Sequence, residues 1–392
     1  MKIAIVIERF EAWRGGAETS TLELARLLKN RGHSIHIVTT TTAPSSPDFT
    51  LHRIPAQSLL RPLRTTAFIR RATAFLQKSQ FDLVHAISPL PSADVYQPRG
   101  GLLGETMERN VATRGSAPRR MLKQAMMAMN VKQRTLAELE RAVFREDGPL
   151  ILAVSQYVAR QCERLYGVTS PRVRVVFNGV NPPNVAADER FAQRSAVRRQ
   201  YHVADSTLLL LFIAHNFRLK GLSPLIDTAA KLVRDGFADF RILIVGRDNP
   251  VGYQRRIDEL KLGRQMTFTG PTQRVSSFYF AADALVHPTY YDPCSRVVLE
   301  GLYYGLPCLT TAFNGAAEAI TNGEEGFVID RPDDIDQWAA RIQGLTDPDV
   351  RRQMSERAVA LRPRISMARH AEQLDAIFQE LTAAKAIQSR SA

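Results

Sequence analysis

Cysteine is scarce in this sequence, and long apolar runs are missing from it. The 392 residues include three cysteines, an odd number without metal-ligand spacing, which argues against a disulfide scaffold and a structural zinc site and favours a reducing compartment. The longest apolar run, residues 208–214, is far shorter than the roughly 20 residues of a membrane-spanning helix. Glu8 and Arg9 interrupt the apolar start of the chain, so no signal peptide is expected. We therefore expect a cytoplasmic protein.

The charge of the chain is unbalanced toward basic residues. Its formal net charge is +13 and its isoelectric point is near 9.9, which favours an anionic partner such as a nucleic acid, a membrane surface or a phosphorylated ligand. Residues 1–180 contain 26 Lys and Arg against 14 Asp and Glu, a net charge of +12, whereas residues 181–392 hold 26 basic and 25 acidic residues. The anionic partner is therefore expected to meet the first half of the chain.

Strand and helix patterns alternate along the chain and predict two α/β domains with parallel sheets. One glycine and two prolines within residues 178–184 indicate a boundary between them. We expect an N-terminal domain over residues 1–180 and a C-terminal domain over residues 181–366, with a final helix, residues 367–392, that packs back on the first domain. The predicted strands are residues 2–7, 34–39, 81–87, 150–154 and 173–177 in the first domain and 208–213, 240–245, 266–269, 284–287 and 307–311 in the second.

Residues 109–145 do not follow this alternation. They contain nine Lys or Arg, together with methionine and leucine residues between positions 121 and 129. A basic helix with an apolar face can lie on an anionic bilayer, which would make the protein peripheral on the inner face of the cytoplasmic membrane. The alternative is an ordinary amphipathic helix that packs on the core and exposes its basic face to solvent.

Two acidic residues, Asp292 and Glu300, lie eight positions apart around a predicted helix start. Pro293 and Ser295 are typical of the beginning of a helix, which predicts an N-cap at Ser295. The N–H groups of residues 295–297 would then face an anion at the positive end of the helix dipole. A phosphate at that end, with carboxylates that accept hydrogen bonds from sugar hydroxyls, would form a nucleotide-sugar site. The alternative is a surface helix that carries two acids by chance.

The motifs around this segment resemble those of glycosyltransferase family 4. Residues 287–318 contain an acid, seven residues and Glu300, then Gly-Leu-Pro, a short strand and a glycine-containing loop that ends in Glu. The first acid is Asp292 where most members have Glu, and His215 stands where Arg is usual. The lipopolysaccharide-core glucosyltransferase branch is the most similar. Further matching motifs, in the order and spacing of the family, are Gly15-Gly16-Ala17-Glu18, Asp82-Leu-Val-His-Ala86, Val176-Phe-Asn-Gly-Val180 and Arg218-Leu-Lys-Gly221.

This resemblance implies a fold and an activity. The fold is GT-B, in which two Rossmann-like α/β/α domains face each other across a cleft. The activity is that of a retaining glycosyltransferase, which moves a hexose from a nucleotide-sugar, in particular a UDP-sugar, to a hydroxyl group of a lipid-linked or cell-envelope glycan such as the lipopolysaccharide core. We expect no cofactor and no metal, because Asp334-Ile-Asp336 and Asp347-Pro-Asp349 are typical of helix caps.

The resemblance also implies roles for individual residues. Lys220 and Arg218 would neutralise the diphosphate as it leaves, because negative charge develops on the leaving phosphate. Asp292 would hold the donor sugar, Glu300 would hold the ribose hydroxyls, and Asp94 would be an acceptor-side acid, with a helix N-cap as its alternative. The other donor-binding residues are the N–H groups of Gly16, Ser295, Arg296 and Val297 for the phosphates, Asn314, Gly315 and Ala316 for the sugar, and Arg247 for the base or the ribose.

Two other functions fit the sequence less well. A nicotinamide dehydrogenase needs Gly-x-Gly-x-x-Gly after the first strand, and only Gly15-Gly16 is present there. The net charge suggests a non-catalytic nucleic-acid-binding protein, but the chain lacks an aromatic-rich binding strand and a recognition-helix signature. We therefore expect no nucleic acid partner.

Overall fold

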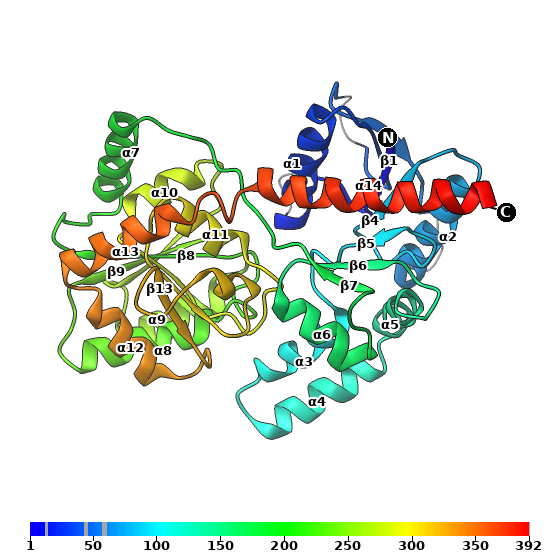
Figure 1. Cartoon of the computed structure of the whole chain (residues 1–392). Helices are drawn as coiled ribbons and strands as arrows, with labels where there is room; N and C mark the ends of the chain where they lie inside the picture. Colours follow the sequence, from blue (N-terminus) through cyan, green and yellow to red (C-terminus); the bar gives the residue numbers. More distant parts are fainter. Residues whose placement is uncertain (12–14, 43–45, 57–60, 392) are drawn as a thin grey trace. The chain divides into compact units, whose positions relative to one another are not determined.

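The chain folds into two compact α/β units (Figure 1). The computed structural model describes residues 1–11, 15–42, 46–56 and 61–391. Unit 1 comprises Met1–Gly179 and Ser366–Ala392, and unit 2 comprises Val180–Ile365. Each unit has its own parallel sheet with helices packed on it, so the predicted pair of Rossmann-like α/β/α domains is confirmed.

Unit 1 is built on a seven-stranded sheet in the order β3-β2-β1-β4-β5-β6-β7. All of its paired strands run parallel. Four of the five residues of the central strand β1 are buried, which explains its almost continuous apolar sequence. The strands are β1 (Lys2–Val6), β2 (Ser34–Thr39), β3 (Thr50–Arg53), β4 (Leu83–Ala86), β5 (Val95–Tyr96), β6 (Leu150–Ala153) and β7 (Val173–Val175).

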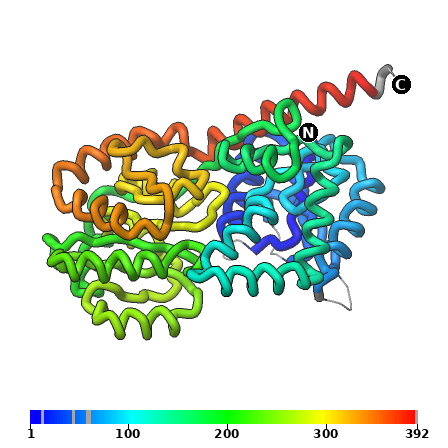
Figure 2. Tube along the Cα trace, turned by 90° about the horizontal axis from the view of Figure 1, so that it is seen from below, coloured from blue at the N-terminus to red at the C-terminus, as the bar shows by residue number. Residues whose placement is uncertain are grey.

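Helix α14 belongs to unit 1 although it follows unit 2 in the chain. It lies against α1 and adds Leu374 and Phe378 to the core of the unit. Asp375 of α14 accepts a hydrogen bond from Arg31 Nε at 2.9 Å and pairs with His33 Nε2 at 2.8 Å. Residues 383–388 are exposed, and the red helix in Figure 2 extends there beyond the rest of the unit. The helices of unit 1 are α1 (Gly16–Asn30), α2 (Arg64–Gln77), α3 (Leu103–Ala112), α4 (Ala117–Ala128), α5 (Val131–Val143), α6 (Gln156–Tyr166) and α14 (Met367–Ser391), with a short 3-10 helix at Arg61–Leu63.

Unit 2 has a six-stranded parallel sheet in the order β10-β9-β8-β11-β12-β13. Helices α8, α9 and α12 cover one face, and α7, α10, α11 and α13 cover the other (Figure 1). The strands are β8 (Leu208–Ile213), β9 (Phe240–Val245), β10 (Met266–Gly270), β11 (Ala284–His287), β12 (Cys308–Thr311) and β13 (Gly326–Ile329). The helices are α7 (Ala187–Gln200), α8 (Leu222–Arg234), α9 (Val251–Glu259), α10 (Val275–Ala281), α11 (Arg296–Tyr303), α12 (Ile335–Gly344) and α13 (Pro348–Ala360), with a 3-10 helix at Gly315–Ala319.

Three buried histidines link the stability of the protein to pH. His85 in β4, His287 in β11 and His370 in α14 are almost completely buried. Burial lowers the pKa of all three, and lowers the pKa of His287 and His370 to about 3. They therefore stay neutral in the folded protein at pH values where histidines of the unfolded chain bind a proton.

We expect the free energy of unfolding to fall steeply once the pH drops below about 6.5. The histidines stabilise the fold fully above that pH, and each loses up to about 1.4 kcal/mol of this stabilisation per pH unit as the pH falls toward the folded pKa, because only the unfolded chain binds the proton. Urea unfolding at about pH 7 and about pH 5.5 measures the slope. His370→Gln should flatten it, whereas His202→Asn, at an exposed histidine, should not. Equal unfolding free energies at the two pH values would contradict the expectation.

Candidate active site

Loops at the carboxyl edge of the unit 2 sheet carry most of the predicted donor-site residues. The strand order changes direction between β8 and β11, with β9 and β10 on one side and β12 and β13 on the other. In open α/β sheets, ligands bind outside the carboxyl ends of the strands at such a point. The loop after β8 carries Arg218 and Lys220, and the loop after β11 carries Asp292 and Ser295.

Lys220 and Asp292 form an ion pair at this edge. Lys220 Nζ lies 2.7 Å from Asp292 Oδ2 and donates a second hydrogen bond to the carbonyl oxygen of Tyr291 at 2.8 Å. Their side chains are only 19% and 14% exposed, so the pair is largely shielded from bulk water. The sequence placed these two residues in one site but did not predict that they pair.

Two glycines allow the loops of this edge to pack closely. Gly221 has a φ of +81°, and a Cβ there would lie 1.8 Å from the carbonyl oxygen of Pro288. A Cβ at Gly246, directly after β9, would lie 1.9 Å from the carbonyl oxygen of Ala214. Larger residues would push the loops apart, so Gly221 lets the loop that carries Lys220 approach the loop after β11, and Gly246 lets the loops after β8 and β9 approach each other.

Arg218 and Arg247 are exposed on neighbouring loops of the same edge. The N–H of Phe217 donates to Asp248 Oδ2 at 2.7 Å, which ties the loop that carries Arg218 to the loop that carries Arg247. Partial desolvation and the charge of Arg247 lower the pKa of His215, so this histidine adds no positive charge at neutral pH. The structure therefore places two exposed guanidinium groups on loops of the same sheet edge that carries the Lys220–Asp292 pair.

Helix α11 begins where the sequence predicts, and Asn314 orders its first turn. Ser295 is the N-cap, and its Oγ accepts a hydrogen bond from the N–H of Val298 at 3.4 Å. Asn314 Oδ1 accepts from the N–H of Ser295 at 3.1 Å and from the N–H of Ala316 at 3.0 Å. The N–H of Ser295 is thus already bonded within the protein, whereas the N–H of Val297 has no acceptor among the residues that the structure describes.

Asn314, Gly315 and Ala316 lie beside the loop that carries Asp292. Asn314 is buried, and its Nδ2 donates to Thr310 Oγ1 at 2.9 Å. Ala316 is buried as well, and the N–H of Gly315 donates to the carbonyl oxygen of Asp292 at 2.9 Å. The role of residues 314–316 toward the donor sugar stays a prediction, and both polar atoms of the Asn314 side chain have partners within the protein that hold the Asp292 loop in place.

Glu300 is oriented by two side chains. Tyr279 on α10 donates its hydroxyl to Glu300 Oε2 at 3.0 Å, and Arg296 Nη2 lies 3.2 Å from Glu300 Oε1. Burial and the nearby Glu300 charge raise the pKa of Tyr279 well above its usual range, so the hydroxyl keeps its proton and donates. Tyr279 was not among the predicted site residues, because it lies on a different helix and outside every motif of the site.

Gly16 and Asp94, the two predicted site residues of unit 1, lie at opposite edges of its sheet. Gly16 is the first residue of α1, which follows β1, so it lies at the carboxyl edge of the sheet of unit 1. Residues 12–14 before it lie outside the described part of the chain. Since Gly16 and the phosphate-site residues of unit 2 belong to different units, its role toward a phosphate stays a prediction.

Asp94 lies at the opposite, amino edge of that sheet, directly before β5. Its Oδ2 accepts from the N–H of Val84 at 2.8 Å, and its Oδ1 lies 2.6 Å from Lys385 Nζ of α14. This position does not support the predicted acceptor-side catalytic role, because ligands of parallel sheets bind at the carboxyl edge. The contacts indicate that Asp94 instead connects β4 to the C-terminal helix.

The two Asp-x-Asp segments are helix caps, as the sequence predicts. Asp334 Oδ1 accepts from the N–H of Gln337 at 3.1 Å, and Asp347 Oδ1 accepts from the N–H of Asp349 at 2.8 Å. Over the described part of the chain, no three His, Cys, Asp or Glu side chains are grouped so that they could hold a metal ion.

Sequence comparisons match both units to known proteins. The family profile "Glycosyltransferase Family 4" matches residues 14–183, and the profile "Glycosyl transferases group 1" matches residues 193–360. The lipopolysaccharide glucosyltransferase WaaG of Escherichia coli (strain K12) is 24% identical over 348 residues, which cover 88% of this chain and 90% of WaaG. A D-inositol 3-phosphate glycosyltransferase of Nocardia farcinica (strain IFM 10152) is 31% identical over 227 residues, which cover 55% of this chain and 49% of that protein.

Solved structures match the chain over nearly its whole length. The crystal structure of WaaG, described as a glycosyltransferase involved in lipopolysaccharide biosynthesis, has a TM-score of 0.79 at 22% identity and covers 96% of this chain and 99% of WaaG. The crystal structure of Anabaena Alr3699/HepE in complex with UDP-glucose has a TM-score of 0.71 at 17% identity, with coverages of 97% and 100%. At these identities the matches establish a shared fold.

Proposed function

The chain belongs to glycosyltransferase family 4 and has the GT-B fold, and from this membership we propose that it is a retaining enzyme that transfers a hexose from a UDP-sugar to a hydroxyl group of a cell-envelope glycan such as the lipopolysaccharide core. In this proposal unit 2 binds the nucleotide-sugar and unit 1 binds the acceptor. The UDP-sugar is supported by HepE, which was solved with UDP-glucose. The acceptor is supported by the similarity to WaaG.

The Lys220–Asp292 pair beside the N-terminus of α11 is the observation that carries this proposal. A lysine ammonium group has three N–H donors. Two of them reach Asp292 and the carbonyl oxygen of Tyr291, so one remains for a phosphate oxygen. The N–H of Val297 and the positive end of the helix dipole favour a second phosphate oxygen nearby.

In the proposed reaction, the bond between the anomeric carbon and the diphosphate oxygen breaks while the acceptor hydroxyl attacks from the same face. The departing diphosphate gains negative charge and takes the proton of the attacking hydroxyl. Lys220, Arg218 and the first turn of α11 stabilise that charge as it develops. Asp292 is engaged with Lys220, which favours this route over a covalent intermediate on Asp292.

Glu300 is proposed to hold the ribose of the donor. A carboxylate accepts hydrogen bonds from hydroxyl groups, and Tyr279 and Arg296 hold the two oxygens of Glu300 at the carboxyl group's present orientation. These two contacts fix the carboxylate before the donor arrives, so no orientational freedom is lost on binding. Arg247, exposed after β9, is proposed to contact the base or the ribose.

Direct binding of nucleotide-sugars tests the donor assignment. A ligand at 100 times its dissociation constant adds about 2.7 kcal/mol to stability, which a thermal unfolding assay detects. We expect UDP-hexoses to raise the melting temperature, and NAD and duplex DNA to leave it unchanged at moderate salt. A protein that binds DNA but no nucleotide-sugar would contradict the proposal.

Transfer is expected to proceed without a divalent metal. The reason is that Lys220, Arg218 and the N-terminus of α11 supply positive charge where the diphosphate leaves. Initial rates in excess EDTA should equal those in magnesium or manganese within about twofold, a factor that corresponds to about 0.4 kcal/mol in the barrier. Activity that disappears in EDTA and returns with either metal would show that a metal-binding role was missed.

Helix α4 and the turn after it are proposed to contact an anionic membrane surface. Only Met127 of α4 is buried, while Met121 is 70% exposed and Arg119 and Arg120 are exposed on the same helix. Apolar side chains exposed beside basic ones suit the interface of an anionic bilayer. No helix in the described part of the chain is long and apolar enough to span a membrane. The other large apolar residues exposed in this segment are Leu122, Met126, Met129 and Val131.

A further inference from the structure

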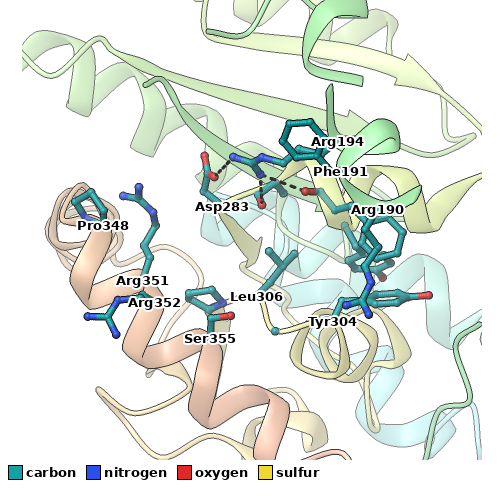
Figure 3. A pocket seen from close by; sticks show the side chains of 15 residues that line it. Arg190, Phe191, Arg194, Asp283, Tyr304, Leu306, Pro348, Arg351, Arg352 and Ser355 are labelled. Carbon is teal, nitrogen blue, oxygen red and sulfur yellow. Dashed lines mark hydrogen bonds and ion pairs between the residues drawn. The ribbon is translucent and has the colours of Figure 1, made fainter. Parts of the chain in front are cut away.

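Unit 2 has a basic pocket at the amino edge of its sheet, opposite the donor-site loops. The pocket has a volume of about 390 Å³, and Figure 3 shows its lining side chains. It is lined by residues that precede β11 and β12, among them Asp283 and Leu306. Helix α11 connects the two places, since its N-terminus lies in the donor site and Tyr304, which follows its last residue, lines the pocket. Of the residues described for the donor site, Tyr279 alone lines this pocket as well.

The charge of the pocket wall is positive. Asp283 is its one acidic residue, and it is paired with Arg194 at 3.0 Å and with Arg198 at 3.3 Å. Arg190 and Arg351, which also line the pocket, have no carboxylate partner among the described residues. An anion that enters the pocket therefore meets two uncompensated guanidinium groups.

These two arginines also have unused hydrogen-bond donors. Arg190 donates through Nε to the carbonyl oxygen of Val185 at 2.7 Å, and Arg351 donates through Nη1 to carbonyl oxygens that include Thr346 O at 3.0 Å. Both Nη groups of Arg190, and the Nε and Nη2 of Arg351, have no acceptor among the residues that the structure describes. The side chains come from α7 and α13 and lie on different sides of the pocket (Figure 3). Guanidinium groups bind phosphate through such paired N–H donors.

Aromatic rings also line the pocket. Phe191 is 72% exposed and lines the pocket next to Arg190, and the ring of Tyr304 lines it as well. Exposed rings give flat apolar surfaces on which the C–H faces of a sugar ring can pack. From guanidinium groups on two sides of the pocket and aromatic rings in its wall, we propose that this pocket is a second ligand site, which binds a phosphate-bearing saccharide independently of the donor.

A contact chain joins this pocket to Glu300. Tyr279 lines the pocket, and its hydroxyl donates to Glu300 Oε2 at 3.0 Å. A ligand that displaces Tyr279 or the end of α11 changes how Glu300 is held, so occupancy of the pocket is expected to change the KM for the donor. This consequence rests on the proposed function, whereas binding at the pocket does not.

Isothermal titration of the full chain with glucose 6-phosphate, glucose and inorganic phosphate, without any donor, tests the site. We expect glucose 6-phosphate to bind and Arg190→Gln/Arg351→Gln to weaken it about 100-fold, since each charged contact is worth roughly tenfold. The control Arg199→Gln/Arg357→Gln removes one arginine from each of the same two helices outside the pocket and should bind like the wild type. Lys220→Ala should also bind like the wild type, because it alters only the donor site.

Several results would overturn the proposal. Glucose 6-phosphate that does not bind, or that binds the double variant and the wild type equally, excludes a site at this pocket. Inorganic phosphate that binds as tightly as glucose 6-phosphate excludes a contribution of the sugar. If the double variant does not fold, the single variant Arg190→Gln tests the site instead, because within the described part of the protein it removes only the hydrogen bond to Val185. We expect it to weaken the binding of glucose 6-phosphate about tenfold. A loss of transferase activity in any variant has no bearing on these binding results.

Discussion

Lys220→Ala should lower kcat/KM for the UDP-sugar by two or more orders of magnitude while the protein stays folded. The lysine is proposed to stabilise charge that develops on the leaving diphosphate, and the loss of one such contact costs roughly 3–4 kcal/mol. The structure adds a second cause, because Asp292 lies 2.7 Å from Lys220 and would face the diphosphate without its cation. Steady-state kinetics over a range of donor concentrations measure the effect.

The neighbouring variants make this prediction specific. Lys231→Ala removes a lysine from the far end of α8, where it pairs with Asp235 and Asp336 at the surface, and should leave the kinetics unchanged. Adding Asp292→Asn to Lys220→Ala should cost less than the sum of the two single losses, because the uncompensated carboxylate is removed. Near-normal kinetics of a folded Lys220→Ala protein would remove the donor-site assignment.

Glu300→Ala is expected to cause a loss of similar size by removing the anchor of the ribose. Tyr279→Phe should raise the KM for the donor about tenfold, because it deletes one hydrogen bond to Glu300 and keeps the carboxylate. Circular dichroism and urea unfolding of each variant separate these effects from loss of structure. A Glu300→Ala protein that keeps its donor affinity would show that the ribose is held elsewhere.

Reversing three charges on α4 should release the protein from anionic vesicles. Arg119, Arg120 and Lys123 lie on this helix, and each basic residue near an anionic surface is worth about 1 kcal/mol. Replacing all three with Glu therefore should weaken binding by at least about 100-fold, since a factor of ten corresponds to about 1.4 kcal/mol. Sedimentation with vesicles that contain anionic lipids measures the bound fraction. Binding of nucleotide-sugars should stay unchanged, because unit 2 is unaltered.

Two controls separate the charge of α4 from that of the whole protein. Changing Arg199, Arg255 and Arg264, three exposed arginines of unit 2, to Glu alters the net charge equally and should leave vesicle binding intact. Replacing Met121, Leu122 and Met126 with Gln should weaken the binding that persists at high salt, because apolar insertion does not depend on screening. Equal sedimentation of the wild type and the α4 triple variant would exclude this surface as the contact.

Local sequence signals predicted the parts of the site that depend on neighbouring residues. Ser295 caps α11, and Asp334 and Asp347 cap α12 and α13, because a cap needs only a short polar side chain next to the start of a helix. The motif order along the chain placed Lys220 and Asp292 in one site. Those inferences hold because each depends on spacing along the chain or on motif order.

The sequence did not predict which side chains from distant segments contact each other. The hydroxyl of Tyr279 reaches Glu300 from another helix, and Asn314 Oδ1 accepts a hydrogen bond from the N–H of Ser295 on the loop after β11. Asp94 is a second example. Its residue type fits a catalytic acid, but its contact with Lys385 of α14 depends on how the C-terminal helix packs on the sheet. These pairings join residues that are 19 to 291 positions apart, a separation that no local pattern encodes.

By itself, the sequence determined that this protein has two parallel α/β units, and it determined which segments form the central strands, because burial on both faces of a sheet requires continuous apolar runs. It also determined the family, through motifs spread over both units. Only the tertiary structure decided which edge of a sheet each polar residue occupies and which partners satisfy it. The physical reason is that hydrogen bonds and ion pairs act over about 3 Å between atoms, so their formation depends on how distant elements pack and not on residue type.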